Sequence, residues 1–163
     1  MDADHSHPPK VLLSLFKLAK QKNIVAIASR YKNTSGISNT TGSISAKILS
    51  WVLNLFIHKF LKLQITDYTS GFIVLPRSVL LNFKLKGDYG EYFIPLIYYA
   101  SKNIRIEEIQ YKSPLRKYGE SKTGRNFIDL TKRGLKYIYI TLKLTINEYT
   151  KQGGSDSSSI PKN

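Results

Sequence analysis

The hydrophobic residues of this chain recur with two different periods, and the order of these periods predicts an α/β protein. Apolar residues recur at spacings of three and four over residues 10–22, and a short continuous apolar run follows over residues 24–28. The first pattern places apolar side chains on one face of a helix, and the second is typical of a strand covered on both faces. We therefore predict an amphipathic helix followed by a buried parallel strand.

Later segments extend this alternation of helix and strand. We predict a helix over residues 43–62, a strand over 73–75, a helix over 88–102 and a strand over 104–112. Glu107 and Glu108 in the last of these are predicted to be edge charges. Residues 126–149 fit a helix, although strict alternation over 137–146 also fits a strand, and we favour the helix. The expected fold class is α/β, with a mixed, mostly parallel sheet and flanking helices.

The helix predicted over residues 43–62 is apolar around most of its circumference. Its polar residues form a thin stripe at spacings of three and four: Lys47, Ser50, Asn54 and His58. Such a helix is either part of the core with one solvated edge, or is pressed against lipid. Its longest charge-free apolar stretch, residues 48–57, is shorter than the ~20 residues that span a bilayer as a helix. We expect a peripheral protein that does not cross the membrane.

The charge of the chain points to an anionic partner. The formal net charge is +14, and residues 110–143 hold nine basic residues against two acids. A sugar nucleotide, a lipid phosphate, an anionic bilayer surface and a nucleic acid all fit this charge. No recognisable nucleic-acid motif is present, so we do not expect a nucleic-acid partner. The absence of cysteine excludes disulfides and thiolate metal sites.

Two acidic residues near the start and a basic loop near residue 120 have the chemistry of a diphosphate site. Asp2 and Asp4 precede the pair Pro8-Pro9, and in an extended chain their side chains share a face. They would then offer two oxygen ligands to one divalent cation, unless they are simply a solvated acidic terminus. Arg116 and Lys122 lie on a glycine-hinged loop, which suits clamping of a diphosphate.

Taken in order, four motifs resemble those of the polyprenyl-phosphate (dolichyl-phosphate) mannose synthases, which are inverting family 2 glycosyltransferases with the GT-A fold. They are Asp2-Ala3-Asp4 with His7-Pro8-Pro9, Ser29-Arg30-Tyr31, Asp67-Tyr68-Thr69-Ser70-Gly71-Phe72, and Tyr118-Gly119-Glu120-Ser121-Lys122. The resemblance implies the C-terminal part of a GT-A domain over residues 1–125. An amphipathic basic segment over 126–150 and a disordered tail over 151–163 are expected to follow.

The same resemblance implies transfer of a hexose, expected to be mannose, from GDP-mannose or a UDP-hexose to a polyprenyl phosphate with inversion. It assigns Mg²⁺ or Mn²⁺ and the donor diphosphate to Asp2 and Asp4, with Arg116 and Lys122 on the phosphates. It assigns the acceptor phosphate to Arg30, Lys47 and Ser50. We expect Asp67 to orient the acceptor, the alternative being a loop cap on the amides of Ser70 and Gly71. The implied location is the cytoplasmic face of a membrane.

The chain departs from the family pattern in three places. Ala46 stands where an arginine is expected four residues before Ser50, with Lys47 as the nearby substitute, and Ile73 replaces the arginine that follows Gly-Phe. The family also begins with a strand-helix-strand half that binds base and ribose, and this chain starts after it. The resemblance therefore implies a split or truncated gene, or a separate chain that supplies this half. An inactive or partner-dependent binding module of the same fold is the alternative function.

Overall fold

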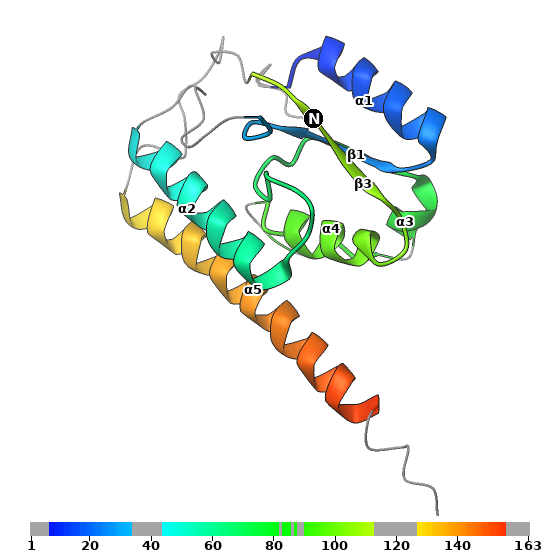
Figure 1. The fold of residues 1–163 in the computed structure, drawn as a ribbon. Helices are drawn as coiled ribbons and strands as arrows, with labels where there is room; N and C mark the ends of the chain where they lie inside the picture. Colours follow the sequence, from blue (N-terminus) through cyan, green and yellow to red (C-terminus); the bar gives the residue numbers. More distant parts are fainter. Residues whose placement is uncertain are drawn as a thin grey trace, which may run out of the picture.

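A small mixed sheet of three strands lies between layers of helices (Figure 1). The computed structural model describes residues 7–33, 44–81, 83–85, 87, 90–112 and 127–155, and within the last segment the side chains of 131–147. The strand β1 (Val25–Ser29) is central and pairs in parallel with β3 (Ile106–Gln110), with Val25 opposite Ile106 and Ser29 opposite Gln110. On its other side, β1 pairs antiparallel with β2 (Ile73–Val74). The α/β fold class and the mixed sheet are confirmed.

The helix α1 (Pro9–Lys22) precedes β1, as the periodicity predicts. It begins directly after Pro8, with a proline at its first position, where a missing N–H is not needed by the helix. It ends at Asn23, which adopts a left-handed conformation and donates its backbone N–H to the carbonyl of Ala19. This tight end turns the chain directly into β1.

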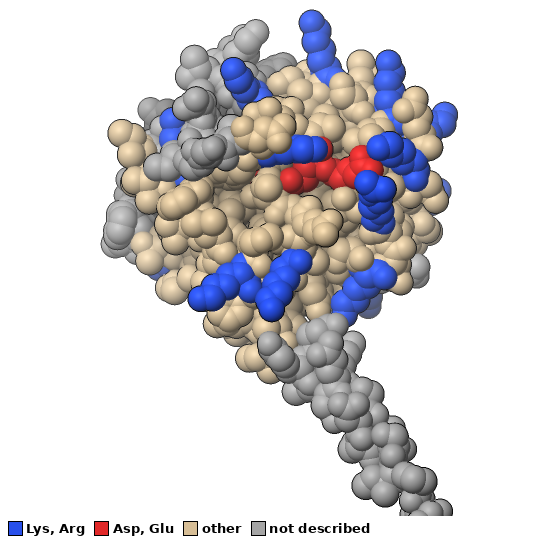
Figure 2. All heavy atoms as spheres, in the orientation of Figure 1, with Lys and Arg blue, Asp and Glu red and all other residues tan. Residues whose placement is uncertain are grey.

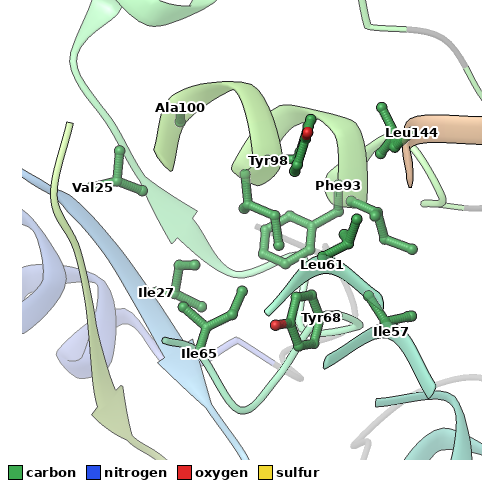
Figure 3. Close-up of a cluster of buried hydrophobic side chains, with 12 residues drawn as sticks. Val25, Ile27, Ile57, Leu61, Ile65, Tyr68, Phe93, Tyr98, Ala100 and Leu144 are labelled. Carbon is green, nitrogen blue, oxygen red and sulfur yellow. The ribbon is translucent and has the colours of Figure 1, made fainter. Parts of the chain in front are cut away.

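The central strand is buried on both faces, as expected for a doubly covered strand. One face of β1, through Val25 and Ile27, contacts a core that also contains Ile57, Phe93 and Leu144 (Figure 3). These three side chains come from α2 (Ile44–Leu61), α4 (Phe93–Ser101) and α5 (Phe127–Ser155). The opposite face, through the alanines of β1, packs against α1 and Phe72. The sheet therefore separates α1 from the other large helices.

The helix α5 settles the ambiguous C-terminal segment. Residues 127–155 form one helix that packs along α2, and both helices run in the same direction (Figure 1). Gly134 marks their close approach, because a Cβ added there would lie 3.8 Å from Leu49. The strand alternative for residues 137–146 is wrong. The helix ends at Ser155, six residues beyond the helix predicted over 126–149, and residues 156–163 of the expected tail lie outside the described residues.

Two other predictions need correction. The predicted helix over residues 88–102 begins only at Phe93, so Pro95 falls in its first turn, where its missing N–H has no helical partner. The expected strand over 73–75 is a half-buried edge strand of two residues, followed by the short helix α3 (Arg77–Leu81). Within the part of the chain that the structure describes, α2 is the one helix long and apolar enough to span a bilayer by length and composition.

Candidate functional site

Polar side chains converge where the central strand ends. Arg30 and Tyr31 follow β1 directly, and the loop over residues 62–72, between α2 and β2, runs past them. Ligands of open α/β folds bind at the carboxyl ends of the strands, where neighbouring loops leave backbone and side chains exposed. The start of the described chain lies nearby, because the ring of His7 stacks on Phe72 with centroids 4.3 Å apart.

Asp67 and Arg30 form the charged centre of this cluster. The Arg30 guanidinium donates from Nε to Oδ2 of Asp67 and from one terminal nitrogen to Oδ1, both at 2.8 Å. The backbone N–H of Arg30 also donates to Oδ2, at 3.0 Å. The Asp67 side chain is completely buried and that of Arg30 is 20% exposed. Burial by itself would lower the pKa of Arg30, but the adjacent carboxylate outweighs it and the pKa is raised.

A row of hydroxyl groups continues from this ion pair to α2. The Thr69 hydroxyl accepts from the guanidinium of Arg30 at 2.6 Å and lies 3.1 Å from the Ser50 hydroxyl. The phenol of Tyr31 donates to Ser50 at 2.9 Å. Asn54, one turn after Ser50, accepts from the backbone N–H of Tyr68 at 2.6 Å and donates to Thr69. The polar stripe of α2 is thus bonded to the loop that carries Asp67.

Glu108 is a site residue that sequence reasoning missed. It is buried, and its carboxylate accepts from the backbone N–H groups of Thr66 and Asp67 at 2.9 and 3.1 Å and from the Thr66 hydroxyl at 2.8 Å. The prediction of an edge charge is wrong for Glu108. Its neighbour Glu107 points to the other side of β3 and pairs with Lys22 at the surface. The alternation of side chains along a strand was the available signal, because two successive glutamates must face opposite ways.

The structure brings together three of the predicted site residues, Arg30, Ser50 and Asp67. Lys47 lies one turn before Ser50 on α2 and is half-buried. Asp67 does cap its loop, but through the backbone N–H of Thr69 at 3.1 Å instead of those of Ser70 and Gly71. Both Asp67 oxygens accept from Arg30, and Oδ1 also accepts from Thr69, so the carboxylate fixes the positions of both residues.

The predicted donor site lies outside the described residues. Asp2, Asp4, Arg116 and Lys122 all fall in the segments that the structure does not describe. Among the residues it does describe, no three His, Cys, Asp or Glu side chains lie close enough to hold a metal ion. Two open cavities of about 510 Å³ each are remote from the Arg30 cluster, one lined by Val79, Tyr99 and Ile104 and the other by Lys22 and Arg105.

The outer layer of the molecule carries two rows of exposed apolar side chains. These side chains are between 37% and 74% exposed, and each row follows helical spacing. They are Ile44, Ile48, Val52 and Leu55 on α2, and Leu135, Tyr139, Leu142 and Ile146 on α5. Both helices bury their opposite sides in the same core, so the two rows lie on one outer face. The surface over these helices is largely neutral with scattered basic groups, whereas acidic side chains gather over β3 (Figure 2).

The exposure pattern of α2 bears on the two alternatives left open for this helix. A core helix with one solvated polar edge would bury its apolar row and expose Ser50 and Asn54. In the structure Asn54 is buried, and the row from Ile44 to Leu55 faces outward. The core interpretation therefore holds only for the side of α2 that carries Leu53, Ile57 and Leu61, which are buried.

The fold and the cluster define an α/β domain, a partial Rossmann-like fold with a polar site at the carboxyl end of its central strand. No protein-family model matches the chain. The chain is 28% identical over 146 residues to a dolichol-phosphate mannosyltransferase from Pyrococcus furiosus, an alignment that covers 88% of this chain and 40% of that protein. This similarity supports a distant relationship to family 2-like glycosyltransferases. The chain spans less than half of the length of this curated relative.

Proposed function

We propose that this chain is part of a glycosyltransferase that transfers a hexosyl unit, with mannose first among the candidates, from a nucleotide sugar to a polyprenyl phosphate. The observation that carries the proposal is the Arg30–Asp67 pair beside the Ser50 hydroxyl, on a helix whose outer face is apolar. A lipid phosphate needs both an anion site and an apolar surface next to it. The similarity to a dolichol-phosphate mannosyltransferase supports the same substrate class.

The acceptor phosphate would bind at Arg30 and Ser50, with Lys47 nearby on α2. A guanidinium carries five N–H donors, and the contacts to Asp67 and Thr69 involve Nε and one terminal nitrogen. The other terminal nitrogen has donors that suit a phosphate oxygen. A phosphate monoester has a second pKa of about 6 and is mostly dianionic at neutral pH, so attack on the sugar requires no strong general base.

The donor diphosphate would be held by Asp2, Asp4, Arg116 and Lys122. Two carboxylates spaced one residue apart are ligands that suit Mg²⁺ or Mn²⁺, and such an ion would stabilise the negative charge on the leaving diphosphate. Arg116 and Lys122 would add to that stabilisation electrostatically. Inversion at the anomeric carbon follows from a single displacement by the acceptor phosphate.

We propose a peripheral location on the cytoplasmic face of a membrane, with α2 and α5 as the contact surface. The two exposed apolar rows lie on one face, and α2 presents Ser50 on its opposite side toward Tyr31 and Thr69. A phosphate at headgroup depth would then lie near the site while its polyprenyl tail remains in the bilayer. The basic residues of α5 would add attraction to anionic lipids.

Binding of farnesyl phosphate, with farnesol as the uncharged control, tests the acceptor site. We expect calorimetry to show tighter binding of the phosphate. Arg30→Lys keeps the charge but loses the bidentate geometry of the guanidinium, and it should weaken phosphate binding by about ten-fold. The surface variant Lys20→Met is the control and should not change the affinity. Equal affinity for phosphate and alcohol, or no effect of Arg30→Lys, would contradict the proposal.

Transfer itself is tested with GDP-mannose or a UDP-hexose, Mn²⁺ and farnesyl phosphate. The chain spans 40% of its relative's length, so transfer is measured both with the chain alone and with a nucleotide-binding half added. An inactive module would bind the lipid phosphate without transfer under either condition.

A further inference from the structure

We propose that Tyr31 is a positioning residue that directs the Ser50 hydroxyl proton toward an oxygen of the bound phosphate. This inference rests on the proposed acceptor site. Its basis is the set of hydrogen bonds around Thr69, Ser50 and Tyr31, which leaves one hydroxyl proton with a poor acceptor among the residues that the structure describes.

The Thr69 hydroxyl is fully engaged. It accepts from the Arg30 guanidinium at 2.6 Å and from the Asn54 side-chain amide at 3.2 Å, so both of its lone pairs are in use. Its own proton is directed to Oδ1 of Asp67, which lies 3.2 Å away. A carboxylate is the strongest acceptor within its reach, and it cannot donate in return.

The Ser50 hydroxyl is bonded differently. Its oxygen accepts from the Tyr31 phenol at 2.9 Å, which directs the Ser50 proton elsewhere. The neighbouring oxygen is that of Thr69 at 3.1 Å, and that atom already accepts two N–H donors. An anionic oxygen placed beside Ser50 is a better acceptor, and the proton can turn to it without breaking a strong bond.

Tyr31 is held firmly enough to impose this direction. It is buried, with 8% of its surface exposed, and its backbone N–H donates to the Ser29 hydroxyl at 3.2 Å. The Arg30 guanidinium carbon lies 5.4 Å from the centre of its ring. The phenol therefore keeps its place beside Ser50 while the ligand site changes from empty to occupied.

Tyr31→Phe removes the phenol donor and keeps the ring, so it isolates the proposed role. Without the phenol donor, the Ser50 hydroxyl can direct its proton into the protein instead of toward the phosphate. We expect calorimetry to show about three- to ten-fold weaker binding of farnesyl phosphate, and unchanged binding of farnesol. The full chain is used, and Tyr99→Phe, an exposed tyrosine on α4 outside the proposed lipid contact surface, is the matched control.

The decisive measurement is the same substitution in the Ser50→Ala background. If Tyr31 acts through Ser50, Tyr31→Phe has no further effect on phosphate affinity there. An equal loss in both backgrounds, or an equal loss for phosphate and farnesol, would overturn the inference and assign Tyr31 a structural role. If Arg30→Lys weakens phosphate binding but Tyr31→Phe does not, the inference about Tyr31 is overturned and the acceptor site stands. No preference of the unaltered chain for phosphate over farnesol would overturn it together with the acceptor site.

Discussion

Asp67 is completely buried, and its charge is matched by the Arg30 guanidinium alone within the described cluster. The two residues lie 37 positions apart, so this pair ties the end of β1 to the loop before β2. Removal of one partner of a buried pair is far more damaging than the net strength of the pair, because the other charge stays buried and unmatched.

Asp67→Asn should therefore destabilise the protein strongly. The amide keeps the size of the side chain but leaves Arg30 without a counter-charge, and we expect the free energy of unfolding to fall by about 3 kcal/mol. Urea denaturation followed by circular dichroism measures this change. Glu107→Gln is the matched control, since its pair with Lys22 is exposed to solvent and should contribute nothing measurable. Equal effects of the two variants would show that the buried pair is not a structural requirement.

The contact between α2 and α5 depends on a glycine inside a helix. Gly134 is buried on α5, and an added Cβ would lie 3.8 Å from a methyl group of Leu49, an ordinary van der Waals distance. The position thus has room for one methyl group but not for a larger side chain.

Gly134→Ala should stabilise the protein, because alanine is the better helix former and fits the gap. We expect the free energy of unfolding to rise by about 0.5–1 kcal/mol in chemical denaturation. Gly134→Phe should lower it by about 1–3 kcal/mol, since the ring would push α5 away from Leu49. A loss of stability with alanine would mean that the helices pack more tightly than the structure shows.

We expect the buried phenol of Tyr137 on α5 to make the free energy of unfolding depend on pH in the alkaline range. Burial and, secondarily, the nearby Glu91 raise the pKa of Tyr137 from 10 to about 12. The folded protein therefore holds this proton more tightly than the unfolded chain does, and the stability present below pH 10 is lost as the pH rises from 10 toward 12. Tyr137→Phe should make the fall in the free energy of unfolding less steep in that window. Tyr139→Phe, at an exposed position, should leave the pH dependence unchanged, and identical curves for both variants would contradict the assignment.

At the scale of the whole molecule, the two sides of the sheet differ in the apolar and basic surface that they present to a bilayer. The outer face of α2 and α5 carries two apolar rows, and α5 adds the basic residues Lys132, Arg133, Lys136 and Lys143. Basic residues near an anionic surface contribute about 1 kcal/mol each, and apolar insertion adds to this. The helix α1, on the opposite side of the sheet, exposes Leu13 and thus provides an internal comparison.

Co-sedimentation with vesicles tests this surface. We expect binding to anionic vesicles that weakens in high salt, and weaker, salt-independent binding to neutral ones. The double variant Val52→Glu/Leu142→Glu should reduce binding about ten-fold or more by burying charge in the interface, while Leu13→Glu should not. Negligible pelleting in all conditions, or equal effects of the two variants, would contradict a membrane contact through α2 and α5.

Local patterns by themselves determined most of the order of helices and strands, although they did not predict the short helix α3. The spacing of apolar residues identified α1, β1 and α2 closely, because helical and strand periods are properties of neighbouring residues. The same patterns placed Ser29-Arg30-Tyr31 at the end of a strand, and hence at the edge of the sheet where ligands bind.

Only the tertiary structure decided which side of each element faces inward. Hydropathy favours burial of the apolar row of α2, yet Asn54 is buried instead, because the loop at Tyr68 and Thr69 brings it hydrogen-bond partners. Glu108 is likewise buried because the amides of Thr66 and Asp67 reach it from about 40 positions away along the chain. A polar group is stable in the protein interior only when it has hydrogen-bond partners there. Those partners come from segments that are distant in the sequence, so the spacing of neighbouring residues cannot predict them.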